Sequence, residues 1–239
     1  MHSNSNKRVP FEDPLSYFPK VLSKLYSSWV RLTYPFASIG RHLSVHYTFT
    51  VNRAMAPRIK LGNSVTMGKD VWLNIIPEAT DEVNIVIDDH CRLAAWCWIS
   101  AKNHIQLEQE VNVEPAVLIM DHGHFYEWTH LPIKKQKPTE GGRIRIERGC
   151  SIGAGSTIIC TQGNLVLGQY CVVTPNSVVL RSVAPYSLVG GNPARVIERL
   201  DPSLINPESA SSLSGEVSLQ SRTVDRPVPV PGSDGVKSR

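Results

Sequence analysis

The stretch IERGCSIGAGSTI, residues 146–158, carries isoleucine at its first, seventh and thirteenth positions, with a run of small residues between the last two. A spacing of six differs from the period of an amphipathic helix, about 3.6, and from the period of two of a simple half-buried strand. The same spacing returns in LGNSVTMGKDVWL, residues 61–73. The chain therefore contains an internal repeat of six residues.

The repeat extends over five triplets of aliphatic residues, and its register slips only between triplets. The triplets are Leu61, Met67 and Leu73; Ile87, Leu93 and Ile99; Leu107, Val113 and Ile119; Ile146, Ile152 and Ile158; and Leu167, Val173 and Val179. If each six residues form a short strand and a corner, three make a triangular coil, and coils stack at about 4.8 Å. The pattern predicts an all-β parallel β-helix, a triangular prism of hexapeptide-repeat coils. An ordinary β-sandwich, the alternative, would show five such triplets only by chance.

The segment before the repeats has the spacing of a helix. Between residues 14 and 32, apolar residues recur at intervals of three or four, with Pro19 near the expected first turn. They are Leu15, Phe18, Leu22, Leu25, Trp29 and Leu32. We expect the helix to pack against the main domain. Because Lys20, Lys24 and Arg31 lie among these residues, peripheral contact with a membrane surface is the alternative.

Composition changes divide the chain into three expected parts. Residues 1–38 form an N-terminal extension with the amphipathic helix, and residues 39–200 form the β-helix domain. Residues 201–239, rich in Ser, Pro and Val, are predicted to be a flexible, disordered tail. Within the domain the repeat stops over 120–143, where a polar segment is expected to protrude as a loop. Long excursions of this kind are usually functional.

Overall composition narrows the class of protein. The chain has 239 residues, 41% of them hydrophobic, which is enough for one full-sized domain. Its net charge of +4 comes from dispersed basic residues, so no nucleic-acid partner is expected. The five cysteines contain no CxxC pair and are predicted to be buried free thiols. Without a leader-like segment or a run of about 18 apolar residues, we expect a cytoplasmic protein.

Three further motifs occur in order along the repeat. They are DHGHFY at 121–126 followed by LPI at 131–133, the coil of residues 146–156, and SVAPYSLVGGNPARVI at 182–197. On these motifs the chain, from about residue 61 to 200, resembles the hexapeptide-repeat acyltransferases. It is most similar to the maltose and galactoside acetyltransferases and the polysaccharide O-acetyltransferases. The resemblance implies a left-handed parallel β-helix, acetyl-CoA as acyl donor, no metal, and a homotrimer with active sites between subunits.

The interrupting segment supplies candidates for a catalytic base. It contains His122, His124 and His130. Transfer of an acyl group to a sugar hydroxyl needs a base near neutral pH, where imidazole titrates. The resemblance implies His124 as the base in preference to His122, and Asp121 or Glu127 would orient the imidazole. The alternative is that these histidines only fasten the loop.

The remaining site residues are also implied by the resemblance. Arg195 would contact the phosphates of CoA, a task that suits a guanidinium. The pantetheine channel would be lined near Ala154, Thr174 and Ser177. The segment 160–164 lengthens one coil relative to the family pattern, in the region that binds CoA. Asn74 and Tyr126 are the expected substrate contacts. The alternative for Asn74 is a purely structural role at a corner or in a loop.

Four functional hypotheses result. The first is an acyl-CoA-dependent O-acyltransferase that esterifies a saccharide, with a nucleotide-linked or lipid-linked sugar as acceptor, in surface polysaccharide synthesis. The second is an N-acyltransferase acting on an amino sugar, since the same base and donor would serve an amine. The third is a metalloenzyme like the γ-carbonic anhydrases, with three histidines on zinc, for which His104 is the nearest candidate outside the loop. The fourth is a non-catalytic assembly module.

Overall fold

The computed structural model describes residues 17–76 and 83–205. The chain divides into two compact units, Met1–Leu200 and Asp201–Arg239. Of the second unit, only the segment around η4 (Pro202–Ile205) is described. The predicted disordered tail therefore lies outside the described residues beyond Ile205, as does the start of the predicted N-terminal extension.

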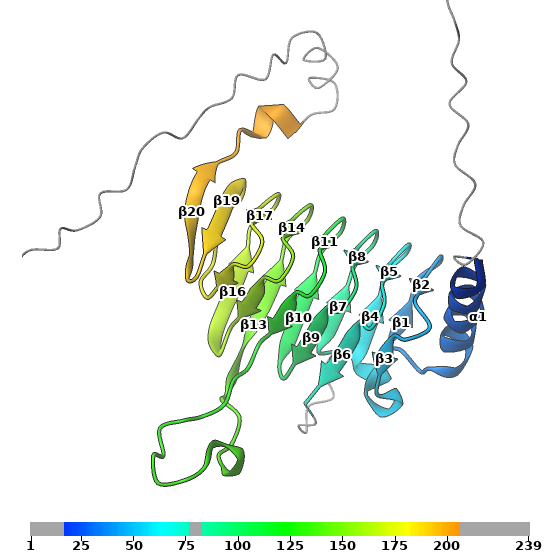
Figure 1. Ribbon diagram of the computed structural model, residues 1–239, viewed down its shortest axis with the longest axis horizontal. Coiled ribbons are helices and arrows are strands. Elements are labelled where there is room, and N and C mark those ends of the chain that lie inside the picture. The colour runs from blue at the N-terminus through cyan, green and yellow to red at the C-terminus, as the bar shows by residue number, and fades with distance from the viewer. Residues whose placement is uncertain (1–16, 77–82, 206–239) are drawn as a thin grey trace, which may run out of the picture. The chain divides into compact units, whose positions relative to one another are not determined.

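Short strands of the first unit stack into three sheets (Figure 1). Each turn adds one parallel strand to each sheet up to β18, and β19 and the antiparallel β20 then extend the second sheet alone. The first sheet contains β1 (Ser38–Ile39), β4 (Ile59–Leu61), β7 (Ile85–Ile87), β10 (His104–Leu107), β13 (Gly141–Ile146) and β16 (Gln162–Leu167). The second contains β2 (Ser44–Val45), β5 (Thr66–Met67), β8 (Arg92–Leu93), β11 (Asn112–Val113), β14 (Ser151–Ile152), β17 (Val172–Val173), β19 (Ser187–Gly191) and β20 (Ala194–Arg199). The third contains β3 (Thr50–Val51), β6 (Trp72–Ile75), β9 (Trp98–Ala101), β12 (Leu118–Met120), β15 (Thr157–Ile159) and β18 (Val178–Val179). The predicted parallel β-solenoid is confirmed.

The aliphatic residues of the repeat stack in register inside this solenoid. Leu61 pairs with Ile87 in the first sheet, and Met67 pairs with Leu93 in the second. Every residue of the five triplets is at most 2% exposed. We call these residues the aliphatic column. Burying each such side chain contributes about 1.5–3 kcal/mol, so the column is the main source of stability that the sequence pattern could reveal.

One coil precedes those that the repeat search found. Ile39, Val45 and Val51 have the same spacing of six and pair in register with the next coil. The predicted repeat does not include this triplet, which η2 (Arg53–Arg58) separates from Leu61. Ile39 is also only half-buried, since it lies in the terminal coil.

The small residues beside the aliphatic positions are required by close approach of the backbone. A methyl group at Gly153 would lie 2.5 Å from the backbone nitrogen of Pro175, and one at Gly62 would lie 2.6 Å from that of Asp89. Neither glycine has a positive φ. These glycines are therefore needed for coil-to-coil contact rather than for an unusual backbone conformation.

Helix α1 (Tyr17–Thr33) covers the first coil, as expected for a helix packed against the main domain. Val30 is fully buried, and the backbone nitrogen of Val45 donates a hydrogen bond to Ser27 Oγ at 2.9 Å. Arg31 Nη1 donates to the carbonyl of Gly40 at 2.8 Å. A terminal coil leaves backbone groups without a strand partner, so polar side chains of α1 satisfy them.

The apolar face that predicts this helix in the sequence is the face that does not pack. Phe18, Leu25, Trp29 and Leu32 are between 52% and 86% exposed. The side that contacts the solenoid instead carries serines, Tyr26 and Val30, because the coil end offers backbone donors and acceptors as well as apolar surface. Within residues 17–76 and 83–205, none of the helices combines the length and apolar character needed to cross a bilayer.

The five cysteines are free and buried, as predicted. Cys91, Cys150 and Cys171 occupy equivalent positions of successive or nearby coils, each two residues before an aliphatic position of the second sheet. Burial raises the pKa of Cys91 to about 12. A hydrogen bond with Cys171, together with burial, raises the pKa of Cys150. All three side chains are at most 1% exposed, so they pack as small core residues.

Candidate functional site

The chain leaves the solenoid after Met120 and returns at Gly141, and the loop between them projects away from the coils (Figure 1). Its two ends lie together. The backbone nitrogen of Thr139 donates to the carbonyl of Gly123 at 2.9 Å, and the Gly123 nitrogen donates to Thr139 Oγ1 at 2.9 Å. An antiparallel bridge between His124 and Pro138 continues this pairing. The loop therefore has a fixed neck.

The outer part of the loop is held by Gln136, which is 8% exposed. Its side-chain amide donates to the carbonyls of Trp128, at 3.0 Å, and Leu131, at 2.9 Å. The ring of Phe125 packs edge-on against Trp128, with centroids 5.5 Å apart. The short 3-10 helix η3 (Ile133–Lys135) lies just before Gln136. The loop thus has internal structure of its own.

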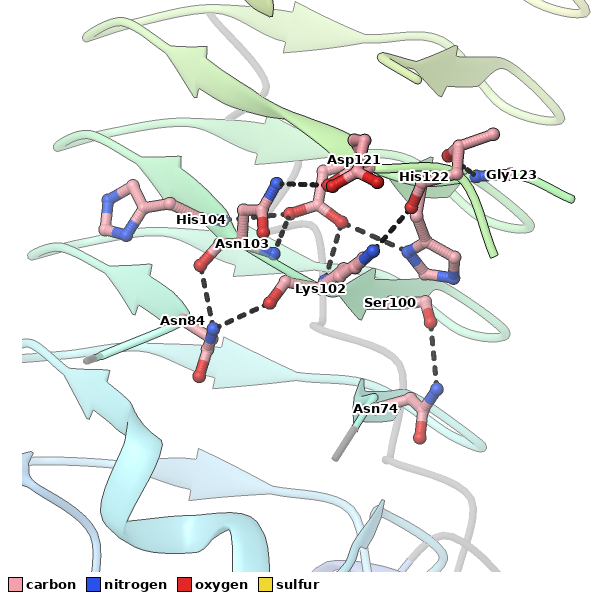
Figure 2. Close-up of polar contacts among 11 residues, drawn as sticks. Asn74, Asn84, Ser100, Lys102, Asn103, His104, Asp121, His122 and Gly123 are labelled. Carbon is pink, nitrogen blue, oxygen red and sulfur yellow. Dashed lines mark hydrogen bonds and ion pairs between the residues drawn. The ribbon is translucent and has the colours of Figure 1, made fainter. Parts of the chain in front are cut away.

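A buried carboxylate fixes the point where the loop begins. Asp121 is fully buried, and Oδ1 accepts a hydrogen bond from the backbone nitrogen of Lys102 at 2.7 Å. Oδ2 accepts from the nitrogens of Asn103, at 2.8 Å, and His104, at 2.9 Å (Figure 2). Three backbone donors on the preceding coil therefore hold one carboxylate. We call Asp121, His122 and the backbone of residues 102–104 the loop foot.

The same backbone segment is held from the other side by Asn84. The Asn84 amide donates to the carbonyls of Lys102, at 3.0 Å, and Asn103, at 2.8 Å (Figure 2). Lys102 Nζ reaches the carbonyl of Thr139 at 2.5 Å. Lys102 is only 7% exposed, although nothing in the sequence distinguishes it from a surface lysine. Together these contacts connect two coils to the neck of the loop.

His122 is oriented by this carboxylate. Its Nδ1 lies 3.1 Å from Asp121 Oδ1 (Figure 2). An Nδ1–H that donates to Asp121 leaves Nε2 unprotonated in the neutral imidazole. The side chain is nevertheless only 10% exposed. His122 is thus positioned to relay or hold a proton at the loop foot, but little of its ring is open to a substrate.

The other loop residues proposed from the sequence lie outside the foot. His124 lies in the neck, and its side chain is exposed. Tyr126 is 74% exposed, and Glu127 and His130 are also exposed. The structure therefore joins Asp121 to His122, and it presents His124 and Tyr126 to the space outside this chain.

Asn74 lies on the third sheet below the loop foot. It is in register with Ser100, and its amide donates to Ser100 Oγ at 2.9 Å. Figure 2 shows both side chains on the same side of Asp121 as His122. Ser100 was not among the predicted site residues, although it follows the inward Ile99 as Asn74 follows the inward Leu73. This shared register position was the available signal.

The residues expected to contact CoA gather at a different corner of the triangular coil. The carbonyl of Ala154 accepts from the Asn176 nitrogen at 2.9 Å, and Thr174 Oγ1 lies 3.0 Å from Ser177 Oγ. Ser177 is fully buried and donates to the Thr174 carbonyl at 2.6 Å. Its hydroxyl therefore holds the corner. Thr174 is only half-buried and the side chain of Arg195 on β20 is exposed, so both are open to a ligand.

Metal ligation was a competing expectation for the histidines. Among the residues that the structure describes, no three His, Cys, Asp or Glu side chains are grouped so that they could hold a metal ion. His104 Nδ1 lies 2.9 Å from the carbonyl of Val83, and Figure 2 shows His104 and His122 on opposite sides of Asp121.

Comparison with known proteins gives short sequence matches and long structural ones. No protein-family model matches the chain. A 59-residue stretch is 44% identical to a dTDP-3-amino-3,6-dideoxy-α-D-galactopyranose 3-N-acetyltransferase of Aneurinibacillus thermoaerophilus, covering 25% of this chain and 29% of that protein. A 71-residue stretch is 41% identical to serine acetyltransferase 2 of Arabidopsis thaliana, covering 28% and 21% of the two chains. The chain therefore spans less than a third of the length of these curated relatives.

The solved structures extend the likeness of the fold over most of the chain. AntD, an N-acyltransferase from Bacillus cereus in complex with dTDP and 3-hydroxybutyryl-CoA, has a TM-score of 0.63 and 18% identity, over 78% of this chain and 95% of that one. A hexapeptide-repeat-containing acetyltransferase from Vibrio cholerae, complexed with acetyl-CoA, has a TM-score of 0.50 and 17% identity over 80% and 91%. With its repeat and its stacked coils, the chain therefore shares the fold of these hexapeptide-repeat acyltransferases, and short stretches of its sequence are similar to acetyltransferases.

Proposed function

We propose that this protein transfers an acyl group from an acyl-CoA, with acetyl-CoA as the expected donor, to a saccharide. The observation that carries the proposal is the interruption of an otherwise continuous solenoid by a loop with a fixed foot and neck. Asp121, with its three backbone hydrogen bonds, fixes where the loop begins. The neck then holds the backbone of His124 and leaves its side chain exposed. An imidazole held in this way can serve as a general base.

In the proposed reaction, His124 removes the proton from the acceptor hydroxyl as its oxygen attacks the thioester carbonyl. The tetrahedral intermediate then expels the CoA sulfur, and the proton returns from the imidazolium to the leaving thiolate. The products are the acyl ester of the saccharide and CoA. Because His122 is oriented by Asp121 but nearly closed to solvent, we assign it to holding the loop foot.

The corner formed by Ala154, Thr174 and Ser177 supports the donor side of the proposal. Ser177 fixes the corner from inside. The half-buried Thr174 hydroxyl, which donates its proton to Ser177 Oγ, can still accept a hydrogen bond from an amide of an extended pantetheine arm. Gly190 and Arg195 are paired across β19 and β20, next to this corner. An exposed guanidinium there can bind phosphate groups through two parallel hydrogen bonds. Two of the solved relatives named above hold acyl-CoA molecules.

The homotrimer is part of the proposal, because the loop and the CoA corner occupy different corners of one coil. A neighbouring subunit would bring its corner to this loop across flat solenoid faces. The exposed Tyr126, Trp128 and Ile133, which are 47–74% exposed, give the loop apolar surface for such a contact. Sedimentation equilibrium should therefore give three times the chain mass.

The acceptor atom separates two forms of the proposal. We expect O-acylation of a saccharide from the resemblance to polysaccharide O-acetyltransferases. N-acylation of an amino sugar is the second candidate, favoured by the 44% identical stretch shared with a nucleotide-sugar N-acetyltransferase. A thiol-release assay with acetyl-CoA, across neutral sugars and nucleotide-linked amino sugars, decides between them.

The proposed base has its own test. His124→Ala should lower turnover by about 10² to 10⁴ without changing the oligomer, whereas His122→Ala should cost much less if it only supports the loop foot. The reverse order would move the base to His122. Near-normal turnover in both variants would contradict a histidine base. If none of the saccharides in the panel supported thiol release, the proposed acceptor class would be wrong.

A further inference from the structure

Helix α1 exposes a continuous apolar stripe. Its residues recur at intervals of three and four and therefore lie on one face of the helix. They are Phe18, Val21, Leu25, Trp29 and Leu32, with exposed fractions of 72%, 54%, 64%, 52% and 86%. The helix spans 17 residues, roughly 25 Å. A run of large apolar side chains this exposed marks an interaction surface.

Aromatic side chains continue the stripe beyond the helix. The ring of Trp29 lies 5.7 Å from Tyr26 and 5.9 Å from Tyr34, between centroids, and Tyr34 stacks on Phe36 at 6.0 Å. Tyr and Trp combine an apolar body with a polar tip, which suits a boundary between water and an apolar phase. The stripe therefore has the composition of an interfacial surface along its length.

The charges of α1 have one sign. Between Tyr17 and Thr33 there are Lys20, Lys24 and Arg31 but no Asp or Glu. Lys24 and Arg31 also line a hollow of about 450 Å³ where α1 meets the first coil. Its other lining residues are Ser27, Ser28, His42, Leu43 and Ser44. Cations and hydroxyl groups beside an apolar stripe are complementary to an anionic headgroup above acyl chains.

We propose that α1 docks this protein onto an anionic lipid surface, with the apolar stripe in the acyl boundary and the cations at the headgroups. The opposite side of the helix is already occupied by the first coil, through Ser27 and Val30. The helix thus lies between solenoid and membrane. A second copy in a two-fold contact is a poorer occupant, because that symmetry would bring the same cations of two helices together without a counter-charge. In the proposed trimer the subunits meet instead across the solenoid faces.

The test is flotation of the full chain with lipid vesicles. The protein should float with vesicles of equal parts phosphatidylcholine and phosphatidylglycerol, and bind much more weakly to phosphatidylcholine alone or at high salt. Leu25→Glu should weaken binding more than about ten-fold. Lys24→Gln should weaken it by about five-fold, the effect of one cation near an anionic surface.

Leu180→Glu is the matched control, because Leu180 is 51% exposed at the other end of the solenoid. It should bind as the unaltered chain does, and all variants should keep the same thermal midpoint. Failure to bind anionic vesicles would overturn the proposal, as would binding that Leu25→Glu leaves unchanged. Loss of self-association in Leu25→Glu, without vesicle binding by the unaltered chain, would assign the stripe to a second copy. Vesicle binding does not depend on acyl transfer, so the two proposals fail separately.

Discussion

The aliphatic column and the loop foot are both buried, but they are stabilised in different ways. The column consists of equivalent layers, in which each side chain packs on its counterparts in adjacent coils. The loop foot depends on one carboxylate, Asp121, which accepts three backbone hydrogen bonds from a neighbouring coil. Stability is therefore distributed in the column and concentrated in the foot. This difference predicts which substitutions will be tolerated.

Removing the carboxylate should have the largest effect on stability. Asp121→Ala leaves the backbone nitrogens of residues 102–104 without an acceptor, and we expect a loss of about 4 kcal/mol in the free energy of unfolding. Turnover should fall with it, since the loop loses its anchor. Asp121→Asn, which keeps one oxygen acceptor, should lose less. Urea unfolding measures the stability of both variants. A loss below about 1 kcal/mol for Asp121→Ala would contradict the role of this carboxylate in holding the loop foot.

Truncation in the column should come next. Leu93→Ala truncates a fully buried side chain of the second sheet. We expect the free energy of unfolding to fall by about 3 kcal/mol, because apolar burial is lost and a cavity remains. Leu180→Ala, at an exposed position, should stay within about 0.5 kcal/mol. Equal losses in the two variants would show that the column does not carry the stability.

A corner substitution tests the close approach of coils. Gly153→Ala places a methyl group 2.5 Å from the Pro175 nitrogen and 2.6 Å from the Val173 carbonyl oxygen, so we expect a loss of about 2 kcal/mol from overpacking. Gly163→Ala has no atom within 4 Å but a φ of +70°, and should lose about 1 kcal/mol from backbone strain. A larger loss of stability for Gly163→Ala than for Gly153→Ala would mean that backbone conformation, rather than contact between coils, is why glycine is needed.

The smallest effect concerns the thiols in the core. Because burial raises the pKa of Cys91 to about 12, its thiol stays protonated as pH rises from about 7 to 9, where an ordinary thiol ionises. Ellman's reagent should therefore react slowly with Cys91 in the native chain across this range, and readily with Cys91 after unfolding. Rapid reaction of Cys91 in the native chain would contradict its place in the core.

Much of the fold could be predicted from the spacing of particular residues. The five triplets predicted which residues pair in all three sheets. The structure has no regular strand between Met120 and Gly141, within the gap in the repeat. The coil of Ile39, Val45 and Val51 was missed because η2 separates it from the next triplet. The face of α1 was not predictable, because apolar spacing reveals an amphipathic helix without showing what each face contacts.

The candidate site was less predictable than the fold. The DHGH motif predicted a site in this segment, and that remains a prediction. Nothing in the motif showed that Asp121 would be buried beneath the backbone of residues 102–104 or that His122 would be nearly closed to solvent. Ser100 and Lys102 were not recognised, because their roles depend on Asn74 and Thr139, which lie far from them in sequence. The roles of His124, Arg195 and the other proposed residues stay predictions.

By itself, the sequence determined which side chains point inward, because a hexapeptide period places one aliphatic residue per strand on the inside wherever the strand occurs. Only the tertiary structure decided which polar groups meet between coils. The chain between equivalent strands varies in length, so the partners of Asp121, Asn74 and Ser27 are set by how coils stack. Hydrogen bonds need that exact spatial match within about 3 Å, whereas apolar burial requires only the correct side of the strand.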